Sequence, residues 1–461
     1  MLDLLEKALP GDVALIENED YFLYSDLLRF SDLVEKKVPS RSLVVFLADN
    51  TAASIMAYVA LLRVGAVMLM VKKGIDEESL HSIIKAFAPS HIWCRESRIA
   101  SVSLVSMGEH ALYQVKDAPP SMDSRLALLL PTSGSLGGAK YVRVTYENIS
   151  SNACSIKQYL GICSTDRAVT TLPFSYSYGI SIVNSHLVAG ASLLVTERSF
   201  FDRLFWDACR DCEVTTFGGV PYSYEMLRKL HFDIRELPSL RYLTQAGGPL
   251  GSETHRWIAE ECLNEGIDFV VMYGQTEATA RMAYLPPEFA LEKVGSVGIA
   301  IPGGRMAVLD EAGTIHDNPG ALGELVYWGA NVTMGYASEA GDLMHGDEFE
   351  GCLQTGDIAR IDEDGFFEIV GRKKRIVKVY GNRVGLDEME NMLRAEGYSV
   401  ACIGKDDLVT IFCDSASFEE LADLASKKTG FPKRVFNVKS IDSLPRNESG
   451  KILYSELSAW L

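Results

Sequence analysis

The sequence predicts an α/β fold: a large N-terminal domain of βαβ-type sheets with an antiparallel β subdomain, plus a small mobile C-terminal α+β domain. Three observations support this prediction. Apolar runs alternate with helical patterns from Asp26 onward, short strands with turn signals replace them over residues 295–370, and the charge of the chain changes near Gly371. The chain has 461 residues, 47% of them hydrophobic, which is enough for a large core and a second domain.

The alternating part predicts βαβ units. A strand pattern followed by a helical pattern and a further strand pattern is typical of a mostly parallel sheet, because the helix carries the chain back to the edge where the strands begin. We expect strands over residues 42–48, 66–71, 91–94, 125–130, 168–172 and 191–195, and helices over residues 51–63, 77–88, 146–160 and 180–188.

The last part of the chain differs in pattern and in charge. Turn signals such as Asn318-Pro319-Gly320 and the loss of long helical patterns predict an antiparallel subdomain. Residues 371–461 carry 15 Lys or Arg against 13 Asp or Glu, whereas the rest carries 29 against 49. A separate domain explains this change, although a solvated basic face would give the same count. We expect an N-terminal domain over residues 1–370, a hinge over 371–374 and a C-terminal domain over 375–461.

The composition and charge of the chain indicate which classes of partner and which cellular location to expect. The formal net charge of −18 disfavours broad binding to nucleic acid or to an anionic membrane. The apolar stretch 57–71 is shorter than the ~20 residues of a membrane span and contains Arg63. Residues 1–10 lack the pattern of a secretory signal, and the nine cysteines lack paired spacing. We therefore expect a cytoplasmic protein with reduced thiols, without a membrane span or a nucleic acid partner.

A loop rich in small residues follows the strand expected over residues 125–130. Small residues let backbone N–H groups approach an anion, hydroxyls add donors and a lysine adds a positive charge, which together suit a polyphosphate. The spacing differs from that of a Walker loop, and a flexible surface loop is the alternative. The segment reads Pro131-Thr132-Ser133-Gly134-Ser135-Leu136-Gly137-Gly138-Ala139-Lys140.

A second segment, Tyr273-Gly274-Gln275-Thr276-Glu277, follows a strand expected over residues 268–272. A tyrosine can stack on a base, a threonine can bind a phosphate, and a glutamate can hold Mg²⁺ through its oxygens. The alternative is the end of a strand with a solvated glutamate. This segment therefore suggests a nucleotide and a cation beside the small-residue loop.

Two further segments carry charged side chains in turns. Thr355-Gly356-Asp357-Ile358, followed by Gly371-Arg372, offers an aspartate to the hydroxyls of a ribose and an arginine that reinforces this contact. Lys451 ends a loop over residues 444–450, near the end of the chain. Taken alone, a β-turn aspartate, a surface arginine and an inert charged tail are the simpler explanations.

Together and in this order, the four segments resemble those of the superfamily that contains acyl-CoA synthetases, amino-acid adenylation domains and firefly luciferase. The phosphate loop of that family usually reads T-S-G-[ST]-T-G-x-P-K-G, and this chain has Leu136, Ala139 and Tyr141 where Thr, Pro and Gly are usual. The resemblance implies ATP and Mg²⁺ as cofactors, and the phosphopantetheine thiol of CoA or of a carrier protein as co-substrate.

The resemblance also implies a role for each matching residue. Tyr273 would stack on adenine, Thr276 would bind the α-phosphate and Glu277 would hold Mg²⁺. Asp357 and Arg372 would bind the ribose, and Lys451 would reach the carboxylate and the α-phosphate. We expect Lys451, Thr276, Glu277 and Lys140 to be catalytic, and the nucleotide to contact Thr132, Ser133, Gly134, Ser135, Gly137, Lys140, Gly247, Gly248, Tyr273, Gly274, Thr276, Asp357, Arg372 and Lys451.

The resemblance further implies a hinge and an acyl pocket. The hinge position falls on Lys374, and Lys378 and Gly381 match the segment that walls the thiol tunnel when the thioester forms; a basic surface strand is the alternative. Ser175 and Tyr176 replace the Phe and His that are usual there, which weakens the analogy to aryl-CoA ligases. The expected pocket residues are Ser175, Tyr176, Tyr178, Gly219, Gln245, Ala246 and Gly247.

These features predict an AMP-forming acid–thiol ligase. It would activate a small carboxylic acid to its acyl-AMP with release of pyrophosphate, and transfer the acyl group to the thiol of CoA or of an acyl carrier protein. The alternatives are an amino-acid adenylating ligase for a peptidyl carrier protein, a nucleotide-binding homologue without turnover, and luciferase-like oxidation of the adenylate. Residues 172–179 offer no clear acidic partner for an α-amino group, and charge does not separate CoA from a carrier protein.

Overall fold

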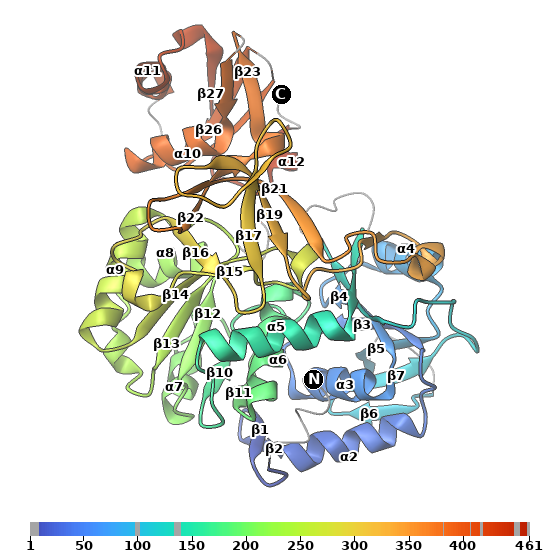
Figure 1. Ribbon diagram of the computed structural model, residues 1–461. Coiled ribbons are helices and arrows are strands. Elements are labelled where there is room, and N and C mark those ends of the chain that lie inside the picture. The colour runs from blue at the N-terminus through green and yellow to red at the C-terminus, as the bar shows by residue number, and fades with distance from the viewer. Residues whose placement is uncertain are drawn as a thin grey trace.

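The computed structural model describes residues 9–96, 102–132, 140–380, 382–405, 407–414, 418–446 and 452–458. Two large sheets and their helices form a body, and a smaller C-terminal part stands above it in the view of Figure 1. This arrangement agrees with the predicted α/β fold class.

The first sheet has 14 strands and combines parallel and antiparallel pairing. The neighbours from β14 to β1 run parallel, and the remaining pairs run antiparallel. In spatial order the strands are β18 (Ile315–His316), β17 (Arg305–Leu309), β19 (Leu322–Trp328), β21 (Cys352–Ile361), β22 (Phe367–Arg372), β16 (Ser296–Ala300), β15 (Ala283–Tyr284), β14 (Asp268–Tyr273), β13 (Tyr242–Gln245), β12 (Thr216–Gly219), β10 (Arg167–Val169), β11 (Ser192–Leu194), β1 (Val13–Glu17) and β2 (Asp20–Leu23).

The second sheet has eight strands, and its centre is fully buried. Its order is β20 (Tyr336–Ala337), β9 (Tyr141–Thr145), β8 (Leu126–Pro131), β4 (Val67–Lys72), β3 (Leu43–Ala48), β5 (His91–Arg95), β7 (His110–Gln114) and β6 (Val105–Met107). Strands β8, β4, β3 and β5 pair in parallel, as expected for βαβ units, because helices cross between them.

Most helices of the body bury one face, whereas α3 and α6 are buried along nearly their whole length. Helices α5 and α6 lie between the two sheets (Figure 1), and one apolar cluster joins them to strands of both sheets. The helices are α2 (Tyr24–Glu35), α3 (Ala52–Val64), α4 (Glu77–Phe87), α5 (Tyr146–Tyr159), α6 (Ser177–Ala189), α7 (Arg203–Asp211), α8 (Pro221–Lys229) and α9 (Ser252–Asn264).

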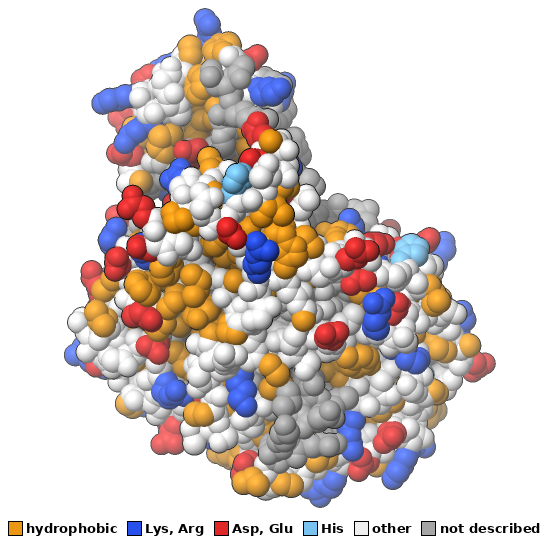
Figure 2. All heavy atoms as spheres, viewed as in Figure 1, with side chains coloured by type: hydrophobic (Ala, Val, Ile, Leu, Met, Phe, Trp, Pro, Cys, Tyr) orange, Lys and Arg blue, Asp and Glu red, His pale blue; other side chains and the backbone are white. Residues whose placement is uncertain are grey.

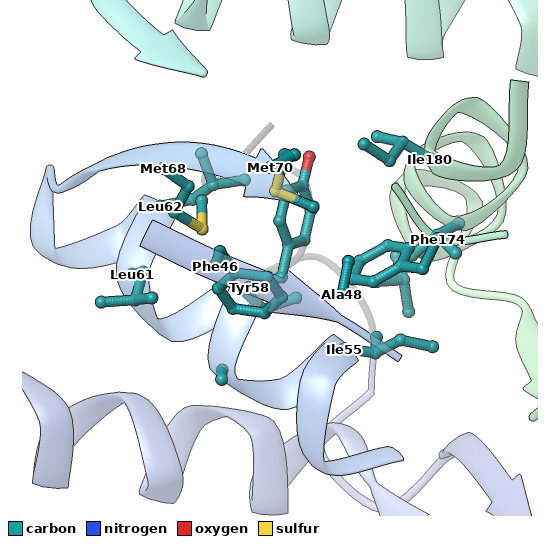
Figure 3. Packing of buried hydrophobic residues seen from close by; sticks show 14 of the residues in the cluster. Phe46, Ala48, Ile55, Tyr58, Leu61, Leu62, Met68, Met70, Phe174 and Ile180 are labelled. Carbon is teal, nitrogen blue, oxygen red and sulfur yellow. The ribbon is translucent and has the colours of Figure 1, made fainter. Parts of the chain in front are cut away.

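Aromatic packing holds the start of α6 against the second sheet. Phe174 lies just before α6, and its ring is 5.2 Å from that of Tyr58 on α3 and 6.4 Å from that of Phe46 on β3. Figure 3 shows these rings within one cluster, together with Ile55 and Ile180. Such packing leaves little freedom to the segment that enters α6, which carries several of the predicted site residues.

The structure shows how the predicted antiparallel part is attached. Apart from β20, which pairs with β9 of the second sheet, the strands of residues 295–370 continue the first sheet. The reason is β15, whose residues Ala283 and Tyr284 pair with the end of β14 on one side and with β16 on the other. This two-residue strand is too short to give a recognisable sequence pattern.

Strand β9 was also not predicted. It follows residues 133–139 directly and pairs antiparallel with β8, so the small-residue loop connects two strands rather than a strand and a helix. Tyr141, the residue in place of the usual glycine, is buried on β9, where its ring packs edge-on against Phe87 at 5.4 Å. Tyr141 therefore contributes to the apolar core at a position where the family usually has glycine.

The C-terminal part has apolar clusters of its own, whose members all come from residues 376–458. It begins after the 3₁₀ turn η6 (Lys373–Arg375). Its elements are β23 (Ile376–Val379), β24 (Asn382–Gly385), α10 (Leu386–Ala395), β25 (Val400–Lys405), β26 (Leu408–Cys413), α11 (Phe418–Thr429), β27 (Phe436–Ser440) and α12 (Tyr454–Ser458).

Two features of the structure bear on the membrane span and the nucleic acid binding that the composition disfavours. Every helix within the described ranges is too short or too polar to cross a lipid bilayer. Figure 2 shows acidic and basic side chains interspersed over the visible face of the described residues. On this face, opposite charges therefore partly cancel at short range.

Burial of a histidine predicts a specific acid sensitivity. His186 on α6 is 2% exposed, and its ring nitrogens contact the Ile182 carbonyl at 2.8 Å and the Tyr242 hydroxyl at 3.0 Å. Burial lowers the pKa of His186 from 6.5 to about 4. Between these values the unfolded chain binds a proton that the folded chain excludes, so His186 lowers the free energy of unfolding by about 1.4 kcal/mol per unit of decreasing pH.

Urea unfolding between pH 6.5 and about 4 measures this effect. The variant His186→Gln should be less stable at neutral pH, because it loses packing and hydrogen bonds, yet its stability should depend less on pH in this range. His81→Gln, on the exposed face of α4, is the matched control and should keep the wild-type slope. Equal slopes in all three proteins would contradict the assignment.

Candidate active site

Three predicted segments meet at one edge of the first sheet. Gly219 at the end of β12 pairs with Gln245 at the end of β13, which pairs with Val271 on β14, all in parallel register. The residues that follow these strands therefore lie side by side. In open sheets of parallel strands, ligands bind beyond the carboxyl ends of the strands, because the loops there leave a crevice.

Asp357 joins two residues that were predicted to bind the nucleoside, Tyr273 and Arg372, and a third, Gln275, that was not. It is 3% exposed and accepts hydrogen bonds from the Tyr273 hydroxyl at 2.6 Å, from Gln275 Nε2 at 2.9 Å and from Arg372 Nε at 3.0 Å. Asp357 and Arg372 are direct cross-strand partners on β21 and β22. Burial and the neighbouring Asp357 carboxylate raise the pKa of Tyr273, so its hydroxyl stays a donor.

A tight turn after β14 sets the directions of Thr276 and Glu277. A Cβ on Gly274 would lie 1.6 Å from the Ala280 carbonyl oxygen, so only glycine fits there. The next residues form a 3₁₀ turn, Thr276–Ala278, in which the Thr276 hydroxyl lies 3.3 Å from that of Ser177 at the start of α6. The turn therefore places two hydroxyls side by side at the edge of the sheet.

Lys140 and Glu277 come together through a residue that was not predicted. The Lys140 ammonium lies 3.6 Å from the ring centroid of Tyr336, and the Tyr336 hydroxyl donates to Glu277 Oε1 at 2.9 Å. A cation over a tyrosine ring is attracted by its electron-rich face. Burial and the Glu277 charge raise the pKa of Tyr336, which keeps the hydroxyl protonated and able to donate.

Several predicted residues lie outside the described part of the chain, namely Ser133, Gly134, Ser135, Gly137, Gly381 and Lys451. Described neighbours flank two of these segments. Thr132 N donates to the Lys140 carbonyl at 3.3 Å, and Arg446 forms an antiparallel bridge with Ile452.

The expected acyl-pocket residues lie around the same edge of the sheet. Ser175 and Tyr176 precede α6, and Tyr178 is on its first turn. Gly247 adopts a positive φ of 92°, which favours glycine, and the Gln245 side chain is buried and donates to the Gly248 carbonyl at 3.0 Å. The remaining members are Gly219, which ends β12, and Ala246, which follows β13.

Ion pairs hold the residues on either side of Lys374, the predicted hinge position. Lys373 contacts Glu324 of β19 at 2.8 Å, whereas Arg375 bonds Asp387 and Glu390 of α10. Lys374 lies between these anchors in the η6 turn. Lys378, by contrast, is exposed on β23 in the C-terminal part.

Sequence reasoning missed three contributors to the site. Gln275 and Ser177 lay inside segments that were recognised, but nothing in a single sequence separates a contacting residue from its neighbours. Tyr336 lay outside every recognised segment. In the sequence it stands after Gly335, near the end of the antiparallel region, and this position alone does not indicate a role in binding or catalysis.

The donor set fits a nucleotide with a divalent cation. A buried carboxylate with an adjacent arginine suits a ribose, and a lysine with neighbouring hydroxyls suits phosphate oxygens. The carboxylate of Glu277 uses one oxygen for Tyr336, and Mg²⁺ is commonly held by one or two carboxylates together with substrate phosphates. The site thus provides hard oxygen ligands for such a cation.

Comparisons with known proteins agree with this geometry. The model of a family described as AMP-binding enzyme matches residues 23–337. A 2-succinylbenzoate–CoA ligase of Listeria innocua is 24% identical and covers 97% of this chain and 96% of that protein. An oxalate–CoA ligase of Arabidopsis thaliana is 28% identical and covers 82% of this chain and 78% of that protein.

Solved structures confirm the fold. ATP-bound MatB from Rhodopseudomonas palustris aligns with a TM-score of 0.81 at 22% identity, over 100% of this chain and 98% of that one. The o-succinylbenzoate coenzyme A synthetase (MenE) of Bacillus subtilis, with ATP and a magnesium ion, aligns with a TM-score of 0.80 at 22% identity, over 99% and 98%. The family match covers well over half of the chain, and this chain therefore belongs to the AMP-binding enzyme family, within the acyl-adenylate-forming superfamily.

Proposed function

We propose that this chain uses ATP and Mg²⁺ to convert a small carboxylic acid to its acyl-AMP, and then transfers the acyl group to the thiol of CoA. The class of the enzyme, an AMP-forming acid–thiol ligase, is confirmed by the family and by relatives that are named CoA ligases. We propose CoA as the acceptor because the names of those relatives specify CoA, and an acyl carrier protein is the alternative acceptor. The cytoplasmic location stays a prediction.

One observation carries this proposal. The segment from Tyr273 to Glu277 joins both halves of a nucleotide site, because Tyr273 and Gln275 bond the Asp357 carboxylate, whereas Glu277 bonds Tyr336 beneath the Lys140 ammonium. A ribose at Asp357 and phosphates at Thr276 and Lys140 would thus be held by one short piece of chain.

The residues supply charge and position to the first half-reaction. A carboxylate that attacks the α-phosphate brings two anions together, so positive charge and hydrogen-bond donors at the reacting atoms lower the barrier. In this proposal Thr276 and Lys140 orient the phosphates, Lys451 reaches the α-phosphate and the incoming carboxylate, and pyrophosphate leaves. Mg²⁺, held by Glu277, would neutralise phosphate charge.

Exchange of radioactive pyrophosphate into ATP tests the proposal directly. Exchange that depends on an added carboxylic acid is expected, and a panel of acids narrows the substrate. Binding of ATP without exchange by any acid would favour the nucleotide-binding homologue without turnover, and exchange only with amino acids would favour the amino-acid adenylating alternative. Thioester formation with CoA or with a carrier protein then separates the two acceptors.

Lys451→Ala should remove most adenylation while acyl transfer from supplied acyl-AMP persists. The lysine charge is needed only where the carboxylate meets the phosphate, and loss of one such electrostatic group costs on the order of 10²-fold in rate. The measurement compares pyrophosphate exchange with CoA thioester formation from synthetic acyl-AMP. An equal loss in both would rule out this role.

Glu277→Gln should raise the Mg²⁺ concentration needed for half-maximal exchange, because the amide keeps the shape but removes the anionic ligand. Tyr336→Phe should shift the same quantity by less, about tenfold, since it removes only the hydrogen bond that orients Glu277. Mg²⁺-dependent ATP binding, followed by calorimetry, gives a readout that is independent of turnover. Thermal melts near that of the wild type exclude unfolding as the cause, and a wild-type Mg²⁺ requirement in both variants would overturn the assignment.

The hinge prediction uses the two anchors beside Lys374. Adenylation and thioester formation need different groups at the same reacting atoms, so we propose that residues 375–461 rotate about Lys374 between them, with the dihedral changes near Gly371. Lys374→Pro would restrict φ to about −65° and should slow thioester formation while exchange survives.

Lys374→Ala is the matched control, because it removes the same charge and leaves the backbone free. Both variants are assayed for exchange and for thioester formation from one acid. If the proline variant forms thioester as fast as the alanine variant, the hinge lies elsewhere or the rotation is unnecessary.

A further inference from the structure

The glycines that line the crevice of the site are covered by side chains of the chain itself. A Cβ on Gly218 would lie 2.9 Å from the Tyr178 hydroxyl, and a Cβ on Gly247 would lie 2.9 Å from the Tyr176 hydroxyl. Gly218 in β12 and Gly247 shortly after β13 lack side chains, and so leave room near the carboxyl ends of the parallel strands, where ligands bind in open sheets. In this protein two phenol groups occupy that room on the α6 side.

Tyr178 is held firmly in this position. Its hydroxyl donates to the Thr244 carbonyl at 3.0 Å and lies 2.8 Å from the Thr244 hydroxyl, and its side chain is 3% exposed. The Arg281 guanidinium lies 4.9 Å from its ring centroid. A ligand that displaced Tyr178 would have to break buried hydrogen bonds, which is costly.

A second layer supports Tyr178 from behind. Arg281 is 2% exposed and donates to the Ser181 hydroxyl at 3.1 Å and to the Tyr159 hydroxyl at 3.2 Å. The favourable contacts of this buried cation are those with the Tyr178 ring, with these hydroxyls and with Met272 Sδ at 3.2 Å. Rotation of Tyr178 away from Thr244 would therefore disturb a buried charge as well.

Tyr176 completes the cover. It precedes α6, packs edge-on against Tyr178 with ring centroids 6.3 Å apart, and burial raises the pKa of its phenol to about 12.

We propose that Tyr176 and Tyr178, the tyrosine pair, close the acyl side of the site, so that this enzyme activates short carboxylic acids and excludes aryl and long-chain acids. This inference rests on the proposed adenylation. The inference predicts a substrate class different from that of the relatives whose names specify aromatic acids. It also fits a site in which the substrate carboxylate has to reach the α-phosphate at Thr276.

Binding of stable acyl-adenylate analogues tests the size limit without turnover. Adenosine sulfamates that carry propionyl, octanoyl and benzoyl groups are compared on the intact protein by calorimetry. The propionyl analogue should bind at least about tenfold more tightly than the other two, in line with the discrimination that a closed apolar pocket provides. Equal binding of all three would overturn the size limit and leave the proposed function intact, whereas failure of all three to bind would contradict the proposed function itself.

Variants of the tyrosine pair show whether these residues set the limit. Tyr176→Ala should bring the benzoyl or octanoyl analogue to within about threefold of the propionyl analogue, and Tyr176→Phe should reduce the preference by less, because it removes the hydroxyl over Gly247 but keeps the ring. Tyr21→Ala, an exposed tyrosine on β2, is the matched control and should bind all analogues like the wild type. Tyr178→Ala is measured in the same way. Because this variant removes a buried side chain, a thermal melt checks that it is folded. An unchanged preference in a folded Tyr176→Ala protein would assign the size limit to other residues.

Discussion

Burying a carboxylate costs free energy unless hydrogen bonds and an opposite charge offset the loss of water. Asp357 meets this condition with Tyr273 and Gln275 from the end of β14 and with Arg372 from the end of β22. One buried charge thus ties the last parallel strand of the first sheet to two antiparallel strands. The nucleoside side of the site and the entrance to the hinge both depend on this contact, because Arg372 is the residue that precedes the η6 turn.

The ion pairs on the two sides of that turn join different parts of the chain. Lys373 is bound to Glu324 in the body, and Arg375 is bound to Asp387 and Glu390 in the C-terminal part. Each side of the turn therefore keeps its own ion pairs if rotation occurs between them. Rotation would break the hydrogen bond from Arg372 N to Asp387 at 3.0 Å, which is exposed and so contributes little.

Much of the fold could be predicted because local patterns decided it. The buried run Leu43–Ala48 and the apolar helix Ala52–Val64 lie where the periodicity placed them, within a residue or so. The joining of the antiparallel strands to the first sheet could not be predicted, because it depends on β15, a strand of two residues. A strand that short is stabilised by its neighbours on both sides and not by its own sequence.

The sequence by itself determined which chemistry the site contains. The order of the motifs indicated a superfamily and singled out Asp357 and Arg372, which the structure places as cross-strand partners on β21 and β22. Only the tertiary structure decided that Tyr336 would bridge Lys140 and Glu277, and that the tyrosine pair would cover the glycines of the crevice. The physical reason is range: motifs and periodicity reflect interactions between near neighbours in the chain, whereas these contacts join residues from separate elements and exist only once the sheets and α6 have packed together.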